Sequence, residues 1–287
     1  MTAKSPSAAM SIDVEDWFQV ENLRSAITRE SWNDRELRVE RNTDRMLELL
    51  AERDIRCTCF VLGWVADRCP DLIRRLAAAG HEIASHGYGH ELVYRLTPSE
   101  FREDVHRCKV VLEDLVSAPV VGYRAPSFSI TDWSIPILQE LGFEYDSSLF
   151  PALAHDRYGR IGGVGPRERI AELSPGFNEV CISSLFVGSR ALPWGGGGYF
   201  RFLPYPVFRR GVASILGSGE PYVFYIHPWE IDPSQPRVAG LPRAHAFRHY
   251  VGLRTAERRF RSLLGDFAWT TVADVLARRA EPTVDSS

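Results

Sequence analysis

The sequence predicts an α/β fold with mostly parallel strands, on three observations. Short apolar segments alternate with amphipathic segments of about 10–15 residues, as in repeated βαβ units. Polar and ionisable residues cluster directly after the apolar segments, at the edge where parallel α/β folds place their active sites. The chain has 287 residues, which suffices for two average domains or for one α/β barrel.

The composition excludes several classes of protein. Hydrophobic residues make up 45% of the chain and charged residues 25%, unlike a disordered, collagenous or coiled-coil protein. The formal net charge of -3 lacks a basic excess, so we expect no nucleic acid partner. Five cysteines without a C-x-x-C motif indicate buried free thiols in a reducing compartment. The absence of a recognisable signal peptide or apolar span predicts a cytoplasmic protein.

The first elements follow from local patterns. Residues 1–10 are expected to form a disordered leader, and the first strand to start at Ser11. Residues 43–53 place apolar residues on one helical face, which predicts a helix. Residues 55–62 are rich in β-branched, aromatic and thiol side chains and stop at Gly63, which predicts a strand.

Proline, glycine and a capping box delimit the next elements. Pro70 suits the first turn of a helix, and Gly80 ends that helix before a short strand over 81–85. Thr97 and Glu100 form a capping box that opens a long amphipathic helix.

The alternation continues towards the C-terminus. Further strands are expected over 120–123, 143–146 and 222–226, and helices over 131–141 and 246–264. We divide the chain into the leader, a barrel over 11–235 and a helical extension over 236–280 packed on the barrel.

Two motifs near strand ends could hold a metal ion. Asp13 and Glu15 point to the same side of an extended chain, and Asp16 follows them. Their simpler alternative is a solvated strand end with helix-capping acids. His86 and His90, at i and i+4, meet on one face if the segment turns helically, which suits zinc. Two unrelated surface histidines are the alternative.

Two further strand ends carry ionisable residues. Arg124 follows the strand over 120–123 and could clamp a carboxylate, with Pro126 stiffening the loop and Phe128 lining a groove. His227 follows the strand over 222–226. The alternative for Arg124 is a surface salt bridge, and the alternative for His227 is a packed core histidine. Four strand ends that each carry an ionisable group are hard to obtain by chance.

Together these segments resemble the NodB-like polysaccharide deacetylases, carbohydrate esterase family four. The sequence motifs of that family, taken in order along the chain, are similar to residues 11–16, 86–90, 124–128, Asp146 and 226–227. The resemblance implies a distorted (β/α) barrel. Three further blocks, 13–20, 196–201 and 249–267, resemble the branch linked to exosortases and exopolysaccharides, which carries a C-terminal extension.

The resemblance also implies roles for these residues. A divalent metal, with zinc expected, would be held by His86, His90 and a carboxylate, leaving an open position for water. The usual Asp-Asp pair is missing, so the carboxylate is Glu15, which we favour, or Asp16. The resemblance further implies that Asp13 is the general base and that Arg124 orients it. It also implies that His227 is the general acid and that Asp146 orients His227. The candidate substrate-binding residues are Pro126, Phe128, Trp194, Tyr199 and Trp229, with core packing as the alternative for the aromatic ones.

The resulting prediction is a metal-dependent hydrolase that removes N-acetyl groups from amino sugars of an exopolysaccharide or its precursor. A metal-independent amidohydrolase acting on a small amide is one alternative, and an inactive carbohydrate-binding protein is another. The expected partner is an N-acetylated oligo- or polysaccharide. The basic C-terminal segment could also touch a membrane-linked precursor. The oligomeric state stays open.

Overall fold

The computed structural model of the chain describes residues 8–150 and 158–280, and these form one nine-stranded sheet beside a two-stranded hairpin. The sheet strands are β1 (Ala8–Val14), β2 (Thr58–Val61), β3 (Glu82–Ser85), β4 (Gly122–Tyr123), β5 (Tyr145–Asp146), β6 (Ile170–Ser174), β7 (Phe177–Val180), β10 (Tyr222–Ile226) and β11 (Trp269–Thr270). The hairpin is formed by β8 (Ser184–Val187) and β9 (Arg190–Pro193).

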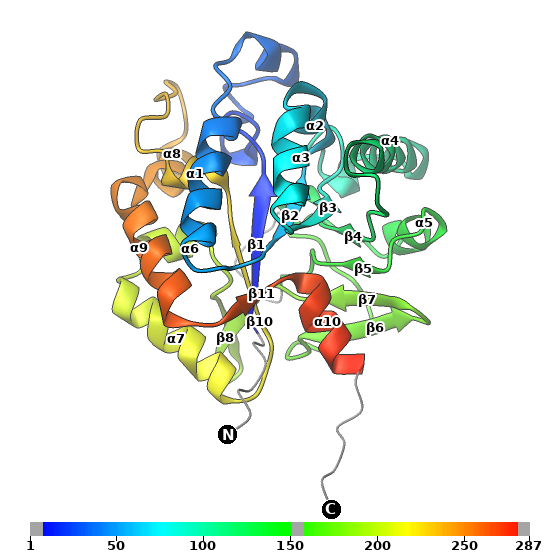
Figure 1. The fold of residues 1–287 in the computed structure, drawn as a ribbon, viewed down its shortest axis with the longest axis vertical. Helices are drawn as coiled ribbons and strands as arrows, with labels where there is room; N and C mark the ends of the chain where they lie inside the picture. The colour runs from blue at the N-terminus through cyan, green and yellow to red at the C-terminus, as the bar shows by residue number, and fades with distance from the viewer. Residues whose placement is uncertain (1–7, 151–157, 281–287) are drawn as a thin grey trace, which may run out of the picture.

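Parallel pairing organises the sheet. Its order is β10-β1-β2-β3-β4-β5-β7-β6, and each neighbouring pair is parallel except β6 with β7. The path stays open between β6 and β10, so the barrel is incomplete. Figure 1 shows β1 at the centre of the fold, with helices ranged around the sheet. The predicted α/β fold with mostly parallel strands is confirmed.

Ten α-helices surround this sheet in the described part of the chain. They are α1 (Val39–Ala51), α2 (Gly63–Arg68), α3 (Pro70–Ala78), α4 (Pro98–Val116), α5 (Ser134–Glu140), α6 (Gly197–Phe202), α7 (Tyr205–Gly217), α8 (Arg243–Tyr250), α9 (Leu253–Asp266) and α10 (Val272–Ala280). None of these described helices combines the length and apolar character that a bilayer crossing requires. The Thr97 capping box of α4 is confirmed.

The first strand starts earlier than the sequence indicated. Ala8, Ala9 and Met10 are fully buried in β1, where they pair with the start of β10. Ala8 and Ala9 have a partner strand on each side, because β11 also pairs with them. The expected leader over 1–10 is therefore wrong for residues 8–10, and residues 1–7 lie outside the described residues.

The extension is not purely helical, and its main helix is interrupted. Its strand β11 joins the central sheet beside β1, so the segment is part of the sheet as well as packed on it. The helix expected over 246–264 is divided into α8 and α9 at Gly252, which has φ +72°. A Cβ atom there would lie 2.3 Å from the Arg201 carbonyl oxygen, so the turn requires glycine.

The five cysteines are free and buried, as expected. Burial raises the pKa of the Cys69 thiol to about 11 and that of Cys108 to about 12. Both thiols are therefore protonated at neutral pH, and protonated thiols are poor nucleophiles. The cysteines act here as small apolar core residues.

A carboxyl pair lies inside the sheet where β5 meets β7. Asp146 and Glu179 are register neighbours and both are completely buried. Burial raises the pKa of each, and the adjacent Asp146 raises that of Glu179 further. One oxygen of each has no other partner, so the pair shares a proton.

Replacing Glu179 by glutamine should stabilise the protein at alkaline pH. Both folded-state pKa values lie above those of the unfolded chain, so the pair loses stability as the pH rises above about 4.5. Glutamine removes that cost and keeps the acceptor for the Ser148 and Leu149 amides. We expect Glu179→Gln to raise the melting temperature by about 2–4 °C at pH 8.

Thermal unfolding at pH 8 and at pH 4 checks this expectation. The gain should shrink at pH 4, where the parent pair is already protonated. Glu172→Gln, at an exposed position on β6, is the matched control and should change neither value. A gain of equal size at both pH values would contradict the shared proton.

Candidate active site

The carboxyl ends of the parallel strands bring the ionisable residues together. Asp13 and Glu15 come from the end of β1, His86 follows β3, Arg124 follows β4 and His227 follows β10. All but Arg124 line one cavity of approximately 120 Å³, to which His90 also contributes. The chain places these side chains together because its parallel strands end at one edge of the sheet.

Glu15, His86 and His90 form the one cluster in the described residues that could hold a metal ion. All three are buried, and their ligand atoms lie within 4.8 Å of one another. His90 Nε2 lies 2.7 Å from Glu15 Oε2, yet this oxygen accepts no well-aligned hydrogen bond. Two donor atoms that converge in this way fit two ligands of one cation.

The ionisation of His86 and Glu15 also suits a metal. Burial disfavours the charged ring of His90, whereas Glu15 raises the pKa of His90, so a cation at this site would compete with a proton on His90. Burial lowers the pKa of His86 to about 4, so its ring is neutral. Its Nδ1 donates to the Arg124 carbonyl at 2.8 Å, which leaves the lone pair on Nε2. Burial favours the neutral acid of Glu15, but the neighbouring imidazoles of His90 and His227 lower its pKa to about 2. Two imidazoles and one carboxylate are a donor set for a divalent transition metal with an open position.

A left-handed loop, rather than a helical turn, brings the two histidines together. Gly87 has φ +71° and His90 has φ +53°, and the two imidazole centroids lie 5.4 Å apart. Asp104 on α4 fixes the loop by accepting the Tyr88 and Gly89 amides at 2.7 and 2.9 Å. The expected proximity is observed, but its cause is this loop.

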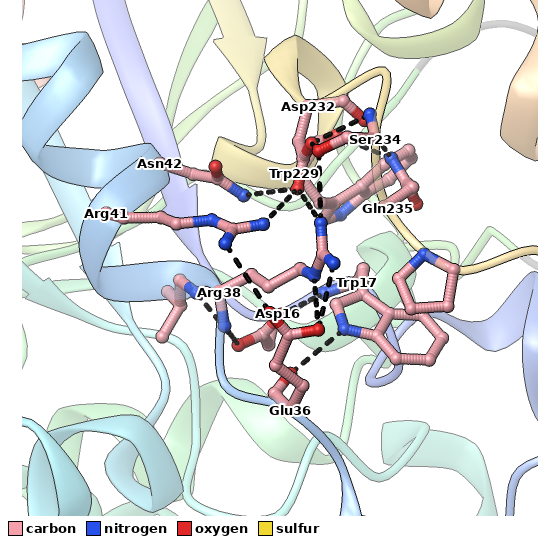
Figure 2. A network of polar contacts seen from close by, with 12 residues as sticks. Asp16, Trp17, Glu36, Arg38, Arg41, Asn42, Trp229, Asp232, Ser234 and Gln235 are labelled. Carbon is pink, nitrogen blue, oxygen red and sulfur yellow. Dashed lines mark hydrogen bonds and ion pairs between the residues drawn. The ribbon is translucent and has the colours of Figure 1, made fainter.

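Asp16 does not belong to the cluster. Its Oδ2 accepts the Arg38 and Val39 amides at 2.7 and 2.8 Å, and its Oδ1 accepts the Trp17 amide at 2.7 Å. These bonds hold Asp16 at the start of α1, as Figure 2 shows. The alternative of Asp16 as the metal carboxylate is therefore wrong. The helix-capping reading, which we set beside the metal reading, applies to this residue.

Arg124 carries a charge at the centre of the molecule and is completely buried. Its Nη1 donates to Asp13 Oδ1 at 2.6 Å and to Ser11 Oγ at 2.8 Å. Its Nε and Nη2 donate to the carbonyl and hydroxyl of Ser147. The guanidinium also lies over the Phe60 ring, 3.9 Å from its centroid. Asp13 is thus held through one oxygen, while Oδ2 faces His227 Nε2 at 3.7 Å.

Glu230, not Asp146, orients His227. His227 Nδ1 lies 2.7 Å from Glu230 Oε1, and Nε2 points to Asp13 and Glu15. Burial opposes the charged imidazole, but Glu15 and Glu230 raise the pKa of His227 to about 9. The role expected for Asp146 is wrong because that carboxyl pairs with Glu179. The spacing H-x-x-E in His227–Glu230 was the signal for this contact, since it places both groups on one turn.

The C-terminal part of the chain supports this pair. Arg201 on α6 is buried and donates from Nε to Glu230 Oε2 at 2.5 Å. Its remaining nitrogens donate to the carbonyls of Arg248, His249 and Val251. One guanidinium therefore joins the turn after β10 to the segment that connects α8 with α9.

Ion pairs anchor the same turn to α1. Figure 2 shows Arg38, Arg41 and Asn42 converging on Asp232, with Nη1 of Arg38 at 3.0 Å from Oδ2. Gln235 donates to the Trp229 carbonyl at 2.8 Å. These contacts hold the turn that carries His227 and Glu230 against the first helix.

The candidate sugar-binding aromatic residues differ in how they lie relative to the cavity. Trp194 is buried against Phe208 with the rings stacked, so its proposed sugar contact is wrong. Trp229 lines the small cavity, and its ring lies between His227 and His249, at 5.2 and 4.5 Å, so its contact with a sugar stays a prediction. Its Nε1 donates to Glu15 Oε1 at 3.2 Å.

The other three candidates lie around the site. Phe128 lines the small cavity, Pro126 is buried beside it, and Tyr199 is half-buried at an adjoining cavity. The Phe128 amide already donates to the Ala125 carbonyl at 2.9 Å, so it is not a donor for substrate.

Comparisons with known proteins show which sequences and folds this chain resembles. A peptidoglycan deacetylase-like protein of Gibberella zeae is 34% identical over 107 residues, which are 37% of this chain and 32% of that protein. The chain covers less than half the length of the first curated relatives that it matches. A putative polysaccharide deacetylase from Mycobacterium smegmatis has a similar structure, with a TM-score of 0.61 and 22% identity over 98% of this chain and 94% of that one.

A pseudoenzyme of carbohydrate esterase family four from Bacillus anthracis shares the fold with a TM-score of 0.50 and 13% identity, over 95% of this chain and 66% of that one. Residues 31–145 match the family described as polysaccharide deacetylase, and residues 147–277 match a domain of unknown function, DUF3473. The second match begins well before residue 236, where we placed the extension, and includes His227 and Glu230. The first part of the chain is therefore similar to polysaccharide deacetylase domains, and the second part is similar to DUF3473.

Proposed function

We propose that the protein hydrolyses the acetamide of an N-acetylated amino sugar, releasing acetate and leaving a free amine. One observation carries this proposal. A two-histidine, one-carboxylate donor set lies in the same cavity as a carboxylate held by Arg124 and an imidazole held by Glu230. Amide hydrolysis needs these parts: a cation site, a base and an acid.

Glu15, His86 and His90 are the residues that would hold the cation, and zinc suits their donor atoms. A divalent cation at these ligands supplies Lewis acidity, which polarises an amide carbonyl and makes water more acidic. The Nε2 lone pair of His86 and the Oε2 atom of Glu15 have no competing well-aligned hydrogen bond.

Asp13 is placed to remove the proton from the attacking water. Arg124 holds Oδ1, so Oδ2 is directed into the cavity. His227 is placed to protonate the departing nitrogen, because its Nε2 faces the cavity and its raised pKa keeps a proton there at neutral pH. Without that proton an amide anion would have to leave, which is prohibitive. The oxygen of water ends in acetate. One water proton passes to Asp13, the other leaves with the acetic acid that forms, and the amine takes its proton from His227. Transfer of the Asp13 proton to His227 then restores the starting state.

We further propose that the substrate belongs to an exopolysaccharide or its membrane-linked precursor, and that the protein acts in the cytoplasm. The sequence blocks over 13–20 and 196–201 support the exopolysaccharide substrate. The second of these blocks supplies Arg201, which holds Glu230. The five free buried thiols support a cytoplasmic location, because the cytoplasm keeps thiols reduced.

Removing a metal ligand should abolish both metal binding and activity. The parent is expected to hold about one equivalent of zinc or a similar ion. His86→Ala should lose it and release no acetate from N-acetylated oligosaccharides. His106→Ala, at an exposed histidine on α4, is the matched control and should keep both.

Metal analysis and acetate release from the same preparations separate the alternatives. Full activity of a metal-free parent in the presence of chelator would favour the metal-independent amidohydrolase. Sugar binding without acetate release would favour a binding protein. Either result contradicts the mechanism proposed here.

Exchanging Glu230 should slow the reaction without weakening substrate binding. Glu230→Gln removes the anion that orients His227, and we expect kcat to fall by about 10–100-fold with KM little changed. Glu230→Asp, which keeps the charge, should recover part of the loss. Thermal unfolding of each variant checks that it folds.

Asp146→Asn is the matched comparison, because Asp146 is the residue that the family pattern favoured for this role. Its carboxyl pairs with Glu179, so kcat should stay close to the parental value. A large fall in kcat for Asp146→Asn but not for Glu230→Gln would overturn the assignment.

A further inference from the structure

A second and larger cavity adjoins the candidate active site. Its volume is approximately 460 Å³, within the range of about 300–1,000 Å³ typical of small-molecule sites. The cavity at the metal ligands has approximately 120 Å³, which falls below that range. His227, Tyr225, Tyr158 and Asn22 line both cavities, so the two spaces share a wall at the catalytic histidine.

The larger cavity is built mainly by the part of the chain that matches DUF3473. Tyr199 and Phe202 come from α6, and Phe247 and Arg248 come from α8. Both helices lie inside the match over 147–277 and outside the polysaccharide deacetylase match over 31–145. This space is therefore a property of the segment that matches DUF3473.

Glycines give the cavity its wall. Gly197 and Gly198 line it, and Gly197 has φ +56°. A Cβ atom on Gly197 would lie 2.5 Å from the Tyr225 hydroxyl oxygen. The run of glycines before Tyr199 thus allows backbone to form a surface where side chains would fill the space.

The chemistry of the lining suits a sugar ring. Phe202 and Phe247 remain 57% and 55% exposed, although their rings pack edge to face at 5.8 Å. Exposed aromatic side chains beside a cavity mark a binding surface, because their faces accept the apolar C–H face of a pyranose. The Arg248 guanidinium also lines the cavity, and its N–H groups are suitable donors for sugar oxygens.

We propose that this cavity binds the sugar unit next to the one that is deacetylated. The inference rests on the proposed function and specifies its substrate as at least a disaccharide. The small cavity accommodates the acetamide beside the metal ligands and Asp13, and the linked pyranose lies in the larger cavity on the other side of His227. The segment that matches DUF3473 thereby selects the length of the sugar chain and the identity of the neighbouring sugar.

Kinetics on a short and a long substrate test the proposal. The probes are N-acetylglucosamine and its β-1,4-linked tetramer, with acetate release as the readout. The parent should have a kcat/KM at least about tenfold higher on the tetramer, since occupied subsites contribute binding energy. Phe247→Ala and Arg248→Ala should each lower kcat/KM on the tetramer severalfold, mainly through KM, and leave the monomer value unchanged.

Val187→Ala, at an exposed apolar residue of β8 that lines neither cavity, is the matched control and should change neither substrate. Equal kcat/KM values of the parent on both substrates, or equal losses on both in Phe247→Ala, would overturn the subsite while the proposed function stands. A parent that releases acetate from neither substrate would overturn the proposed function and the subsite with it.

Discussion

The buried charge of Arg124 is the constraint on which the arrangement of the site depends. A guanidinium without solvent must find an anion and hydrogen-bond acceptors, because an uncompensated buried charge is strongly destabilising. Asp13 on β1 supplies the anion, and Ser11 and Ser147 supply acceptors from either side. Satisfying this one group fixes β1, β4 and the chain after β5 relative to one another, and it fixes Asp13 Oδ2 towards the cavity.

The second half of the site depends on a chain of alternating charges. Arg201, Glu230 and His227 follow one another from the extension to the cavity, and each is buried or nearly so. The carboxylate compensates the guanidinium and at the same time raises the pKa of the imidazole. The segment that matches DUF3473 is therefore part of the candidate active site, because its Arg201 and Glu230 hold His227 and its Glu230 helps to raise the pKa of His227.

Local sequence patterns predicted the elements well where they carried strong signals. The strand over 222–226 has the predicted bounds, and Thr97 caps its helix as expected. The patterns failed where tertiary contacts prevail. Ala8 to Met10 join β1 because β10 and β11 cover them, and Gly252 interrupts a regular helical pattern because the Arg201 carbonyl approaches it. The contacts of Ala8 to Met10 and of Gly252 are with residues far away in the sequence, so no local pattern predicts them.

The sequence by itself determined the α/β fold and the strand ends that carry ionisable groups. These features follow from periodicity and from spacing within short segments. Only the tertiary structure decided between Glu15 and Asp16, and only it placed Glu230, which the sequence had not indicated, against His227 in place of Asp146. Each choice depends on which side chain meets which partner: Asp16 meets the free amides of α1, and Asp146 meets Glu179 across the sheet. Residue types of equal chemistry differ in role here because burial and neighbours, not identity, set their charge and direction.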